Sequence, residues 1–149
     1  MSNTAPNTKK KKLTSKQMVK RLHKECAKLW KEICFKRDGH QCQVWKRFGN
    51  RVEILHAGPL QVDHCITRSN KHLFYDTKNG TVVCGSCNRA KGFGQKSVGR
   101  AIDQIVMERE GLECFNNMVD LDHKKSANPD FNKIWWLEEV RDGLELELK

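Results

Sequence analysis

The chain has 149 residues and a formal net charge of +10 at pH 7, with 31% charged and 38% hydrophobic residues. This length suffices for one domain with a modest core. No apolar run approaches the roughly 20 residues of a membrane-spanning helix, so no membrane association is expected. The seven cysteines are an odd number without a secretory signal, which argues against a disulfide scaffold and predicts a reducing, cytoplasmic location.

The charge is unevenly distributed along the chain. Residues 1–60 carry 15 lysines and arginines against 4 acidic residues, residues 61–100 carry 7 against 2, and residues 101–149 carry 6 against 12. The first two thirds of the chain are therefore expected to attract a polyanion such as DNA, with an affinity that falls steeply with salt.

The N-terminal region is predicted to be a basic arm followed by a long helix. Residues 1–12 include a run of four lysines and offer nothing to bury, which predicts a disordered arm that contacts phosphates. Over 15–37, apolar residues recur every three or four positions and Gly39 follows, which predicts an amphipathic helix. Its apolar stripe is expected in the core, while its lysines could lie along DNA.

The middle of the chain predicts two strands and a short helix. Residues 52–65 alternate between apolar and polar side chains, which indicates strand pieces around a loop at 56–59. A second strand is predicted at 80–83, and a helix over 84–91 that the following glycines end.

The C-terminal part is predicted to be helical. A helix over 97–110 has apolar residues at helical spacing and is followed by Gly111. A final helix is expected to begin at Pro129 and to contain Phe131. The chain thus divides into the basic arm, a central domain that includes the N-terminal basic helix, and an acidic helical extension packed on that domain, at residues 1–12, 13–111 and 112–149.

The central domain carries a group of side chains suited to metal-dependent hydrolysis. They are Asp63, His64, Asn79, Cys84, Cys87 and Asn88. Histidine can act as a general base near neutral pH, and the side-chain oxygens of aspartate and asparagine suit a hard divalent cation. Two cysteines at Cys-x₂-Cys spacing at the start of a helix are typical of half of a tetrahedral zinc site. These residue types together predict phosphodiester cleavage.

The chain resembles the zinc-stapled HNH endonucleases. The resemblance lies in the Asp63-His64 pair and in the string that follows it, Asn79-x₄-Cys84-x₂-Cys87-Asn88-x₂-Lys91. The resemblance covers roughly residues 37–95. It implies an α+β fold with a small ββα-metal (His-Me finger) core flanked by N- and C-terminal helices. The implied activity is hydrolysis of DNA, by nicking or double-strand cleavage, to 5′-phosphate and 3′-hydroxyl ends.

The resemblance also implies a role for each motif residue. His64 is the general base, Asp63 and Asn88 bind a catalytic Mg²⁺ or Mn²⁺, and Asn79 braces the loop that orients His64. Asn88 stands where the family more often has histidine, an HNN variant that leaves the physiological metal open.

The structural zinc site departs from the family pattern in its first half. Trp45 stands where a second cysteine is usual, which leaves three of the four ligands that tetrahedral zinc requires. The three are Cys42, Cys84 and Cys87. His56 is the leading candidate for the fourth ligand. The alternatives are His40, Cys34, Cys65 and a cysteine cluster that packs without metal.

Four basic side chains near the motif are expected to contact DNA: Arg68, Lys71, Arg89 and Lys91. Arg68 and Arg89 are favoured for the scissile or adjacent phosphate because they flank the two metal-site segments in sequence. His72 follows in the same loop as Arg68 and is expected to be solvent-exposed.

Two other functions stay open. Small HNH proteins resembling this chain are often encoded by phages and mobile elements, which suggests a DNA-binding packaging, replication or recombination accessory that needs partner proteins in the host cytoplasm. A zinc-binding RNA or regulatory module is the other, although Asp63, His64 and Asn79 together argue against it. The sequence predicts neither the DNA target nor an oligomeric state, and it has no obvious heptad seam.

Overall fold

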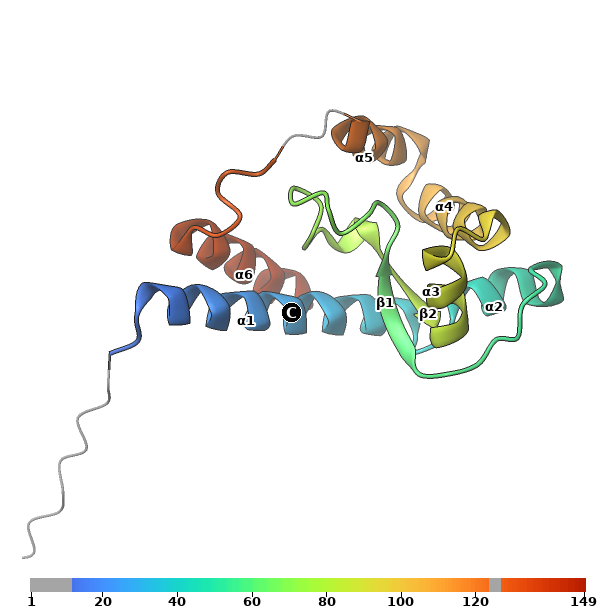
Figure 1. The fold of residues 1–149 in the computed structure, drawn as a ribbon, viewed down its shortest axis with the longest axis horizontal. Helices are drawn as coiled ribbons and strands as arrows, with labels where there is room; N and C mark the ends of the chain where they lie inside the picture. The colour runs from blue at the N-terminus through green and yellow to red at the C-terminus, as the bar shows by residue number, and fades with distance from the viewer. Residues whose placement is uncertain (1–11, 124–126) are drawn as a thin grey trace, which may run out of the picture.

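The computed structural model describes residues 12–123 and 127–149 (Figure 1). In this part of the chain, six α-helices surround a two-stranded antiparallel sheet, which confirms the α+β class. Most of the predicted basic arm lies outside the described residues. No helix of the described segments is long and apolar enough to cross a membrane.

The longest element is helix α1, Ser15–Asp38, which forms one side of the molecule (Figure 1). It begins with a capping box, in which the side chain of Thr14 accepts a hydrogen bond from the backbone of Gln17 and the Gln17 side chain accepts one from the backbone of Thr14. It ends at Gly39, whose φ of 67° is the left-handed conformation that closes a helix. Both ends agree with the prediction to within one residue.

The sheet is a hairpin of β1, Leu60–His64, and β2, Gly80–Cys84, paired so that Leu60 faces Cys84 and His64 faces Gly80. A 3₁₀ turn, η2 (Thr77–Asn79), leads into β2, and α3, Gly85–Gly92, follows it directly. The chain therefore runs strand, long loop, strand, helix. The predicted strand piece at 52–55 is wrong. A strand needs a partner for its backbone hydrogen bonds, and the sheet of the described residues contains only β1 and β2, which pair with each other.

Four further helical elements complete the fold: α2 (Gln43–Phe48) with the 3₁₀ turn η1 (Gly49–Arg51), α4 (Lys96–Glu110), α5 (Leu112–His123) and α6 (Ile134–Leu148). The α4 helix was predicted, whereas α2 and α5 were not. The final helix begins at Ile134, so the prediction that Pro129 starts it is wrong. Pro129 and Phe131 lie in the turn that precedes α6.

Two hydrophobic clusters lie on opposite faces of the hairpin. Because side chains alternate along a strand, Val82 packs with α1 and α6, whereas Val83 packs with α2, α4 and α5. The contact between α1 and α6 means that the acidic C-terminal helix is part of the same packed structure (Figure 1).

A buried polar network fixes the hairpin to the end of α1. The Asp38 carboxylate accepts hydrogen bonds from the backbone N–H of Val82 at 2.9 Å and from the Arg37 guanidinium. Arg37 also donates to the carbonyls of Thr77 and Gly80, each at 2.7 Å. The start of β2 is thereby held against α1, which positions the loop between the strands.

Substitution of Gly80 by alanine is expected to destabilise the protein, whereas the same substitution at Gly143 should stabilise it. A Cβ at Gly80 would lie 2.6 Å from Cys34 Sγ and 2.9 Å from Trp30 Cζ2, and overpacking of this kind costs about 1–3 kcal/mol. Gly143 lies inside α6 with open space around it, so alanine there should add about 0.5–1 kcal/mol. Urea denaturation of both variants measures the two effects, and equal midpoints would contradict the close packing at Gly80.

Candidate metal centre and active site

Four side chains from separate elements form a cluster whose ligand atoms all lie within 4.8 Å of one another: Cys42, His56, Cys84 and Cys87. Cys42 immediately precedes α2, His56 lies in the loop before β1, and Cys84 and Cys87 lie at the junction of β2 and α3. The cluster therefore ties three parts of the chain together at the base of the hairpin, and it could bind a metal ion.

The distances within the cluster are those of a tetrahedral metal site. The sulfurs of Cys42 and Cys87 are 3.8 Å apart, and His56 Nδ1 lies 3.3 Å from Cys87 Sγ and 3.9 Å from Cys84 Sγ. Zinc–sulfur bonds of about 2.3 Å and zinc–nitrogen bonds of about 2.0 Å at tetrahedral angles put two sulfurs about 3.8 Å apart and a sulfur and a nitrogen about 3.5 Å apart. These three pairs of side chains stand close to the separations that a shared ion requires.

The protonation of the cluster also favours cation binding. The hydrogen bond from the Cys87 thiol lowers the pKa of Cys42 to about 4, against the opposing effect of burial. The same contact raises the pKa of Cys87. The contact thus favours the thiolate form at Cys42, and a bound cation would favour loss of the remaining thiol protons.

His56 is the histidine that joins this cluster, and the other candidates for the fourth ligand lie elsewhere. Cys34 is buried against α6 and the carbonyl of Thr77, Cys65 contacts Asp103, and His40 stacks on Phe35. Trp45, which replaces the expected cysteine, is 50% exposed and packs with its ring centroid 5.0 Å from that of His56. The other imidazole nitrogen, Nε2, is buried without a hydrogen-bond partner in the described residues. Nδ1 is the nitrogen that lies beside the cysteine sulfurs, so it is the candidate ligand atom.

His64, the predicted general base, is the last residue of β1 and is only 7% exposed. Its Nε2 donates a hydrogen bond to the carbonyl of Phe74 at 2.8 Å, and its ring stacks on Trp30 at 4.4 Å between centroids. Burial lowers the pKa of His64, against the opposing effect of the Phe74 carbonyl. The imidazole is therefore neutral at pH 7 with its proton on Nε2, which makes Nδ1 the basic nitrogen.

Asn79, fully buried at 0% exposed, holds the loop that contains Phe74. Its side-chain oxygen accepts a hydrogen bond from the backbone N–H of Ile66 at 2.6 Å. Its amide nitrogen donates to the carbonyls of Ile66 at 3.1 Å and Leu73 at 3.2 Å. Since Leu73 directly precedes Phe74, these bonds determine the position of the carbonyl that orients His64.

The predicted catalytic metal ligands have other partners: Asp63 is on the face of β1 opposite His64, and Asn88 is on α3. The Asp63 carboxylate accepts a hydrogen bond from Lys91 Nζ at 2.6 Å, and the Asn88 amide donates to the side-chain oxygen of Gln61 at 2.9 Å. No contact between Asp63 and Asn88 is among the hydrogen bonds of the described residues. The two oxygens that remain, one on each side chain, suit a hard cation.

Lys91 has a role that the sequence did not reveal. Its ammonium, on α3, bonds to the Asp63 carboxylate and also to the backbone carbonyls of His64 and Cys65. It was expected to contact DNA, whereas the structure gives it three partners at the end of β1. No sequence signal pointed to this contact, because the two side chains are 28 positions apart.

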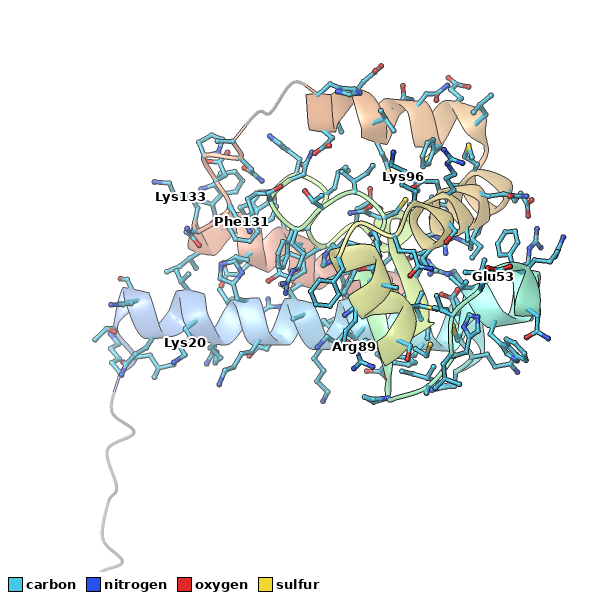
Figure 2. All side chains as sticks on the ribbon, turned by 45° about the vertical axis from the view of Figure 1, so that its right-hand side comes forward. Lys20, Glu53, Arg89, Lys96, Phe131 and Lys133 are labelled. Atoms are coloured by element: carbon cyan, nitrogen blue, oxygen red, sulfur yellow. The ribbon has the colours of Figure 1, made fainter. Side chains whose placement is uncertain are left out.

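The other basic candidates differ in their freedom to bind phosphate. Arg68 and Arg89 are exposed and have no ion pair in the described residues. Arg89 is on α3 (Figure 2). Lys71 lies over the rings of Phe74 and Phe131, 4.5 and 5.0 Å from their centroids. The neighbouring His72 is exposed, as expected.

Comparison of the chain with models of protein families, with curated proteins and with solved structures finds no match. The interpretation of the site therefore depends on its geometry and chemistry.

Replacing Asn79 by alanine should destabilise the protein by about 3 kcal/mol. The change removes three hydrogen bonds and leaves the backbone groups of Ile66 and Leu73 buried without partners, and each such loss costs about 1–3 kcal/mol. The control is Asn117→Ala, at an exposed position of α5. Urea denaturation should separate the two variants, and unfolding of Asn79→Ala at the wild-type midpoint would show that Asn79 does not brace the loop.

Proposed function

We propose that this protein is a metal-dependent DNA endonuclease of the HNH type, which hydrolyses phosphodiester bonds to 5′-phosphate and 3′-hydroxyl ends. The proposal has one principal support, the chain of contacts from Asn79 through Leu73 and Phe74 to His64. A buried neutral imidazole whose Nε2 donates to a fixed carbonyl has its second nitrogen available as a general base.

The proposed roles are those that the resemblance to HNH endonucleases implies for the side chains at the end of β1 and on α3. His64 removes a proton from the attacking water through Nδ1. Asp63 and Asn88 supply oxygens for a Mg²⁺ or Mn²⁺, which would stabilise charge on the scissile phosphate and the leaving oxygen. Lys91 holds the Asp63 carboxylate in place.

The structural part of the proposal is that the cluster of Cys42, His56, Cys84 and Cys87 binds zinc. Three thiolates and one imidazole are a donor set typical of structural zinc, and with four protein ligands no coordination position is left for water. Because α3 begins with this cluster, the ion would fix the helix that carries Asn88 and Lys91.

A cleavage assay tests the proposal directly. Zinc-loaded protein is incubated with supercoiled plasmid and Mg²⁺, Mn²⁺ or no added divalent ion. The expected result is nicked or linear DNA only when Mg²⁺ or Mn²⁺ is present, with ends that DNA ligase can reseal. Intact plasmid under every condition, with a folded protein that binds it, would overturn the self-sufficient enzyme.

A DNA-binding accessory that needs partner proteins is the second candidate, and the Lys91–Asp63 ion pair favours it. In this structure the ammonium of Lys91 already neutralises the carboxylate expected to hold the catalytic ion. A partner that displaces Lys91 would then be required for activity. Cleavage that appears only when phage packaging or replication proteins are added would support this function.

A further inference from the structure

A groove of about 670 Å³, open to solvent, lies between α1, the loop after β1 and the segment before α6. We call it the α1 groove. Its lining consists of four lysines, aromatic side chains and three smaller groups: Lys16, Lys20, Lys24, Lys71, His23, Phe74, Tyr75, Phe131, Asn132, Val19 and Ala27.

The aromatic part of the α1 groove is held in place by hydrogen bonds and ring contacts. His23 contacts the Tyr75 hydroxyl through Nδ1 at 2.8 Å and the side-chain oxygen of Asn132 through Nε2 at 3.0 Å. The Phe131 ring lies 4.7 Å from that of His23 and 5.3 Å from that of Phe74, between centroids. Phe74 and Phe131 are only partly buried, so the groove offers aromatic surface whose position is fixed before a ligand binds.

The wall of the α1 groove is positively charged. Lys16, Lys20 and Lys24 follow one another at a spacing of four residues, which places them in a row on one face of α1. All three are exposed, and none has a carboxylate partner in the described segments. The lining contains no carboxylate, so the row of ammonium groups is available for the phosphates of an anionic ligand.

The groove adjoins the proposed active site. Phe74 contributes its ring to the groove and its carbonyl to the hydrogen bond with His64. The rings of Phe74 and His64 are 5.1 Å apart between centroids. Phe131, which precedes α6, and Lys20, on α1, both line the groove (Figure 2).

We propose that the α1 groove binds an unpaired nucleotide of the DNA substrate, with its base packed against Phe131 and its phosphates on the lysine row. Aromatic side chains beside a positively charged groove are the arrangement by which proteins bind single strands without sequence preference. A paired base is stacked inside the duplex and cannot reach the rings. This inference rests on the proposed function, and it makes DNA with a single-stranded segment the preferred substrate.

The test measures binding without cleavage, by fluorescence anisotropy of a labelled single strand and a duplex of equal length, with zinc-loaded protein and no added Mg²⁺ or Mn²⁺. Phe131→Ala should weaken single-strand binding by roughly 5-fold to 100-fold and change duplex binding by less than about twofold. The matched control is Phe93→Ala, since Phe93 is 89% exposed and outside the groove. A single strand with abasic sites should bind wild type and Phe131→Ala equally.

The lysine row is tested by a second variant that should not affect folding. The double change Lys20→Ala, Lys24→Ala should lower the slope of log affinity against log salt for single strands by about 0.7 per lysine. Lys96→Ala is the control, because Lys96 is at the start of α4, away from α1 (Figure 2).

Equal weakening of single strands and duplexes by Phe131→Ala, or no weakening of either, overturns the inference. An unchanged salt slope in the double lysine variant overturns it as well. These outcomes are independent of cleavage. Groove-dependent binding of single strands without cleavage under any metal would contradict the proposed nuclease and leave the groove assignment standing.

Discussion

His64→Ala is expected to slow DNA nicking by about 10²-fold to 10⁴-fold while DNA binding changes little. This is the range that a positioned general base contributes to proton transfer. The adjacent Asp63 carboxylate lies on the other face of β1 and is bound by Lys91, so it is not placed to take over the role of the imidazole. The measurement is the single-turnover nicking rate at saturating protein, together with the Kd for the same DNA.

The matched control is His72→Ala in the loop that follows β1. His72 is exposed and its side chain makes no hydrogen bond in the described residues, so its loss should leave the nicking rate within about twofold of wild type. His64→Ala also removes a ring stacked on Trp30, so both rates are measured at a temperature at which each variant is folded by circular dichroism. Full activity of a folded His64→Ala protein would remove His64 from the mechanism.

The metal cluster shows how far a sequence pattern determines a site. Cys84 and Cys87 could be paired from the sequence because both belong to one turn at the start of a helix, where their spacing fixes their separation. Cys42 and His56 come from other elements, and their approach depends on how α2 and the loop before β1 pack. The resemblance supplied Cys42, whereas the fourth ligand could be narrowed only to a few residues. The fold brings His56 to the cluster.

The face of β1 that carries Asp63 was harder to predict. Strand periodicity places Asp63 and His64 on opposite faces, but it does not tell which helix covers each face. The helix α3 brings Lys91 to Asp63, and α1 brings Trp30 to His64. Both contacts join residues far apart in the chain, and a single sequence contains no signal for them.

The helices that were missed have weak local signals. The α2 helix has six residues and no side-chain cap at its start, so neither length nor capping marks it. The α5 helix follows α4 after Gly111 alone, and within the predicted acidic helical extension no separate start signal marks it. Proline is common at the first position of a helix, so Pro129 resembled a helix start. In the structure α6 begins only at Ile134, and Phe131, between the two, lines the α1 groove.

Cys87→Ser should remove the bound metal and destabilise the protein more than any other single change considered. Its sulfur lies 3.8 Å from that of Cys42 and 3.3 Å from His56 Nδ1, so it contacts two of the other ligand groups directly. Structural zinc contributes binding free energies of about 10–16 kcal/mol, which are available to folding. Loss of one ligand should therefore cost at least about 3 kcal/mol, or roughly 10 °C in Tm for a chain of this size.

The control for Cys87→Ser is Cys114→Ser, which alters a half-buried cysteine outside the cluster. Elemental analysis of the wild type and of Cys114→Ser should find about one zinc per chain, and Cys87→Ser should retain little. Chelation should lower the Tm of the wild type and of Cys114→Ser, and it should have little further effect on Cys87→Ser. A wild type that holds no metal after purification in zinc-containing buffer, and whose Tm is insensitive to chelation, would identify the four side chains as a packed cluster without an ion.

Because Asn88 and Lys91 lie on the helix that begins at this cluster, loss of the ion should also reduce nicking in proportion to the loss of folded protein.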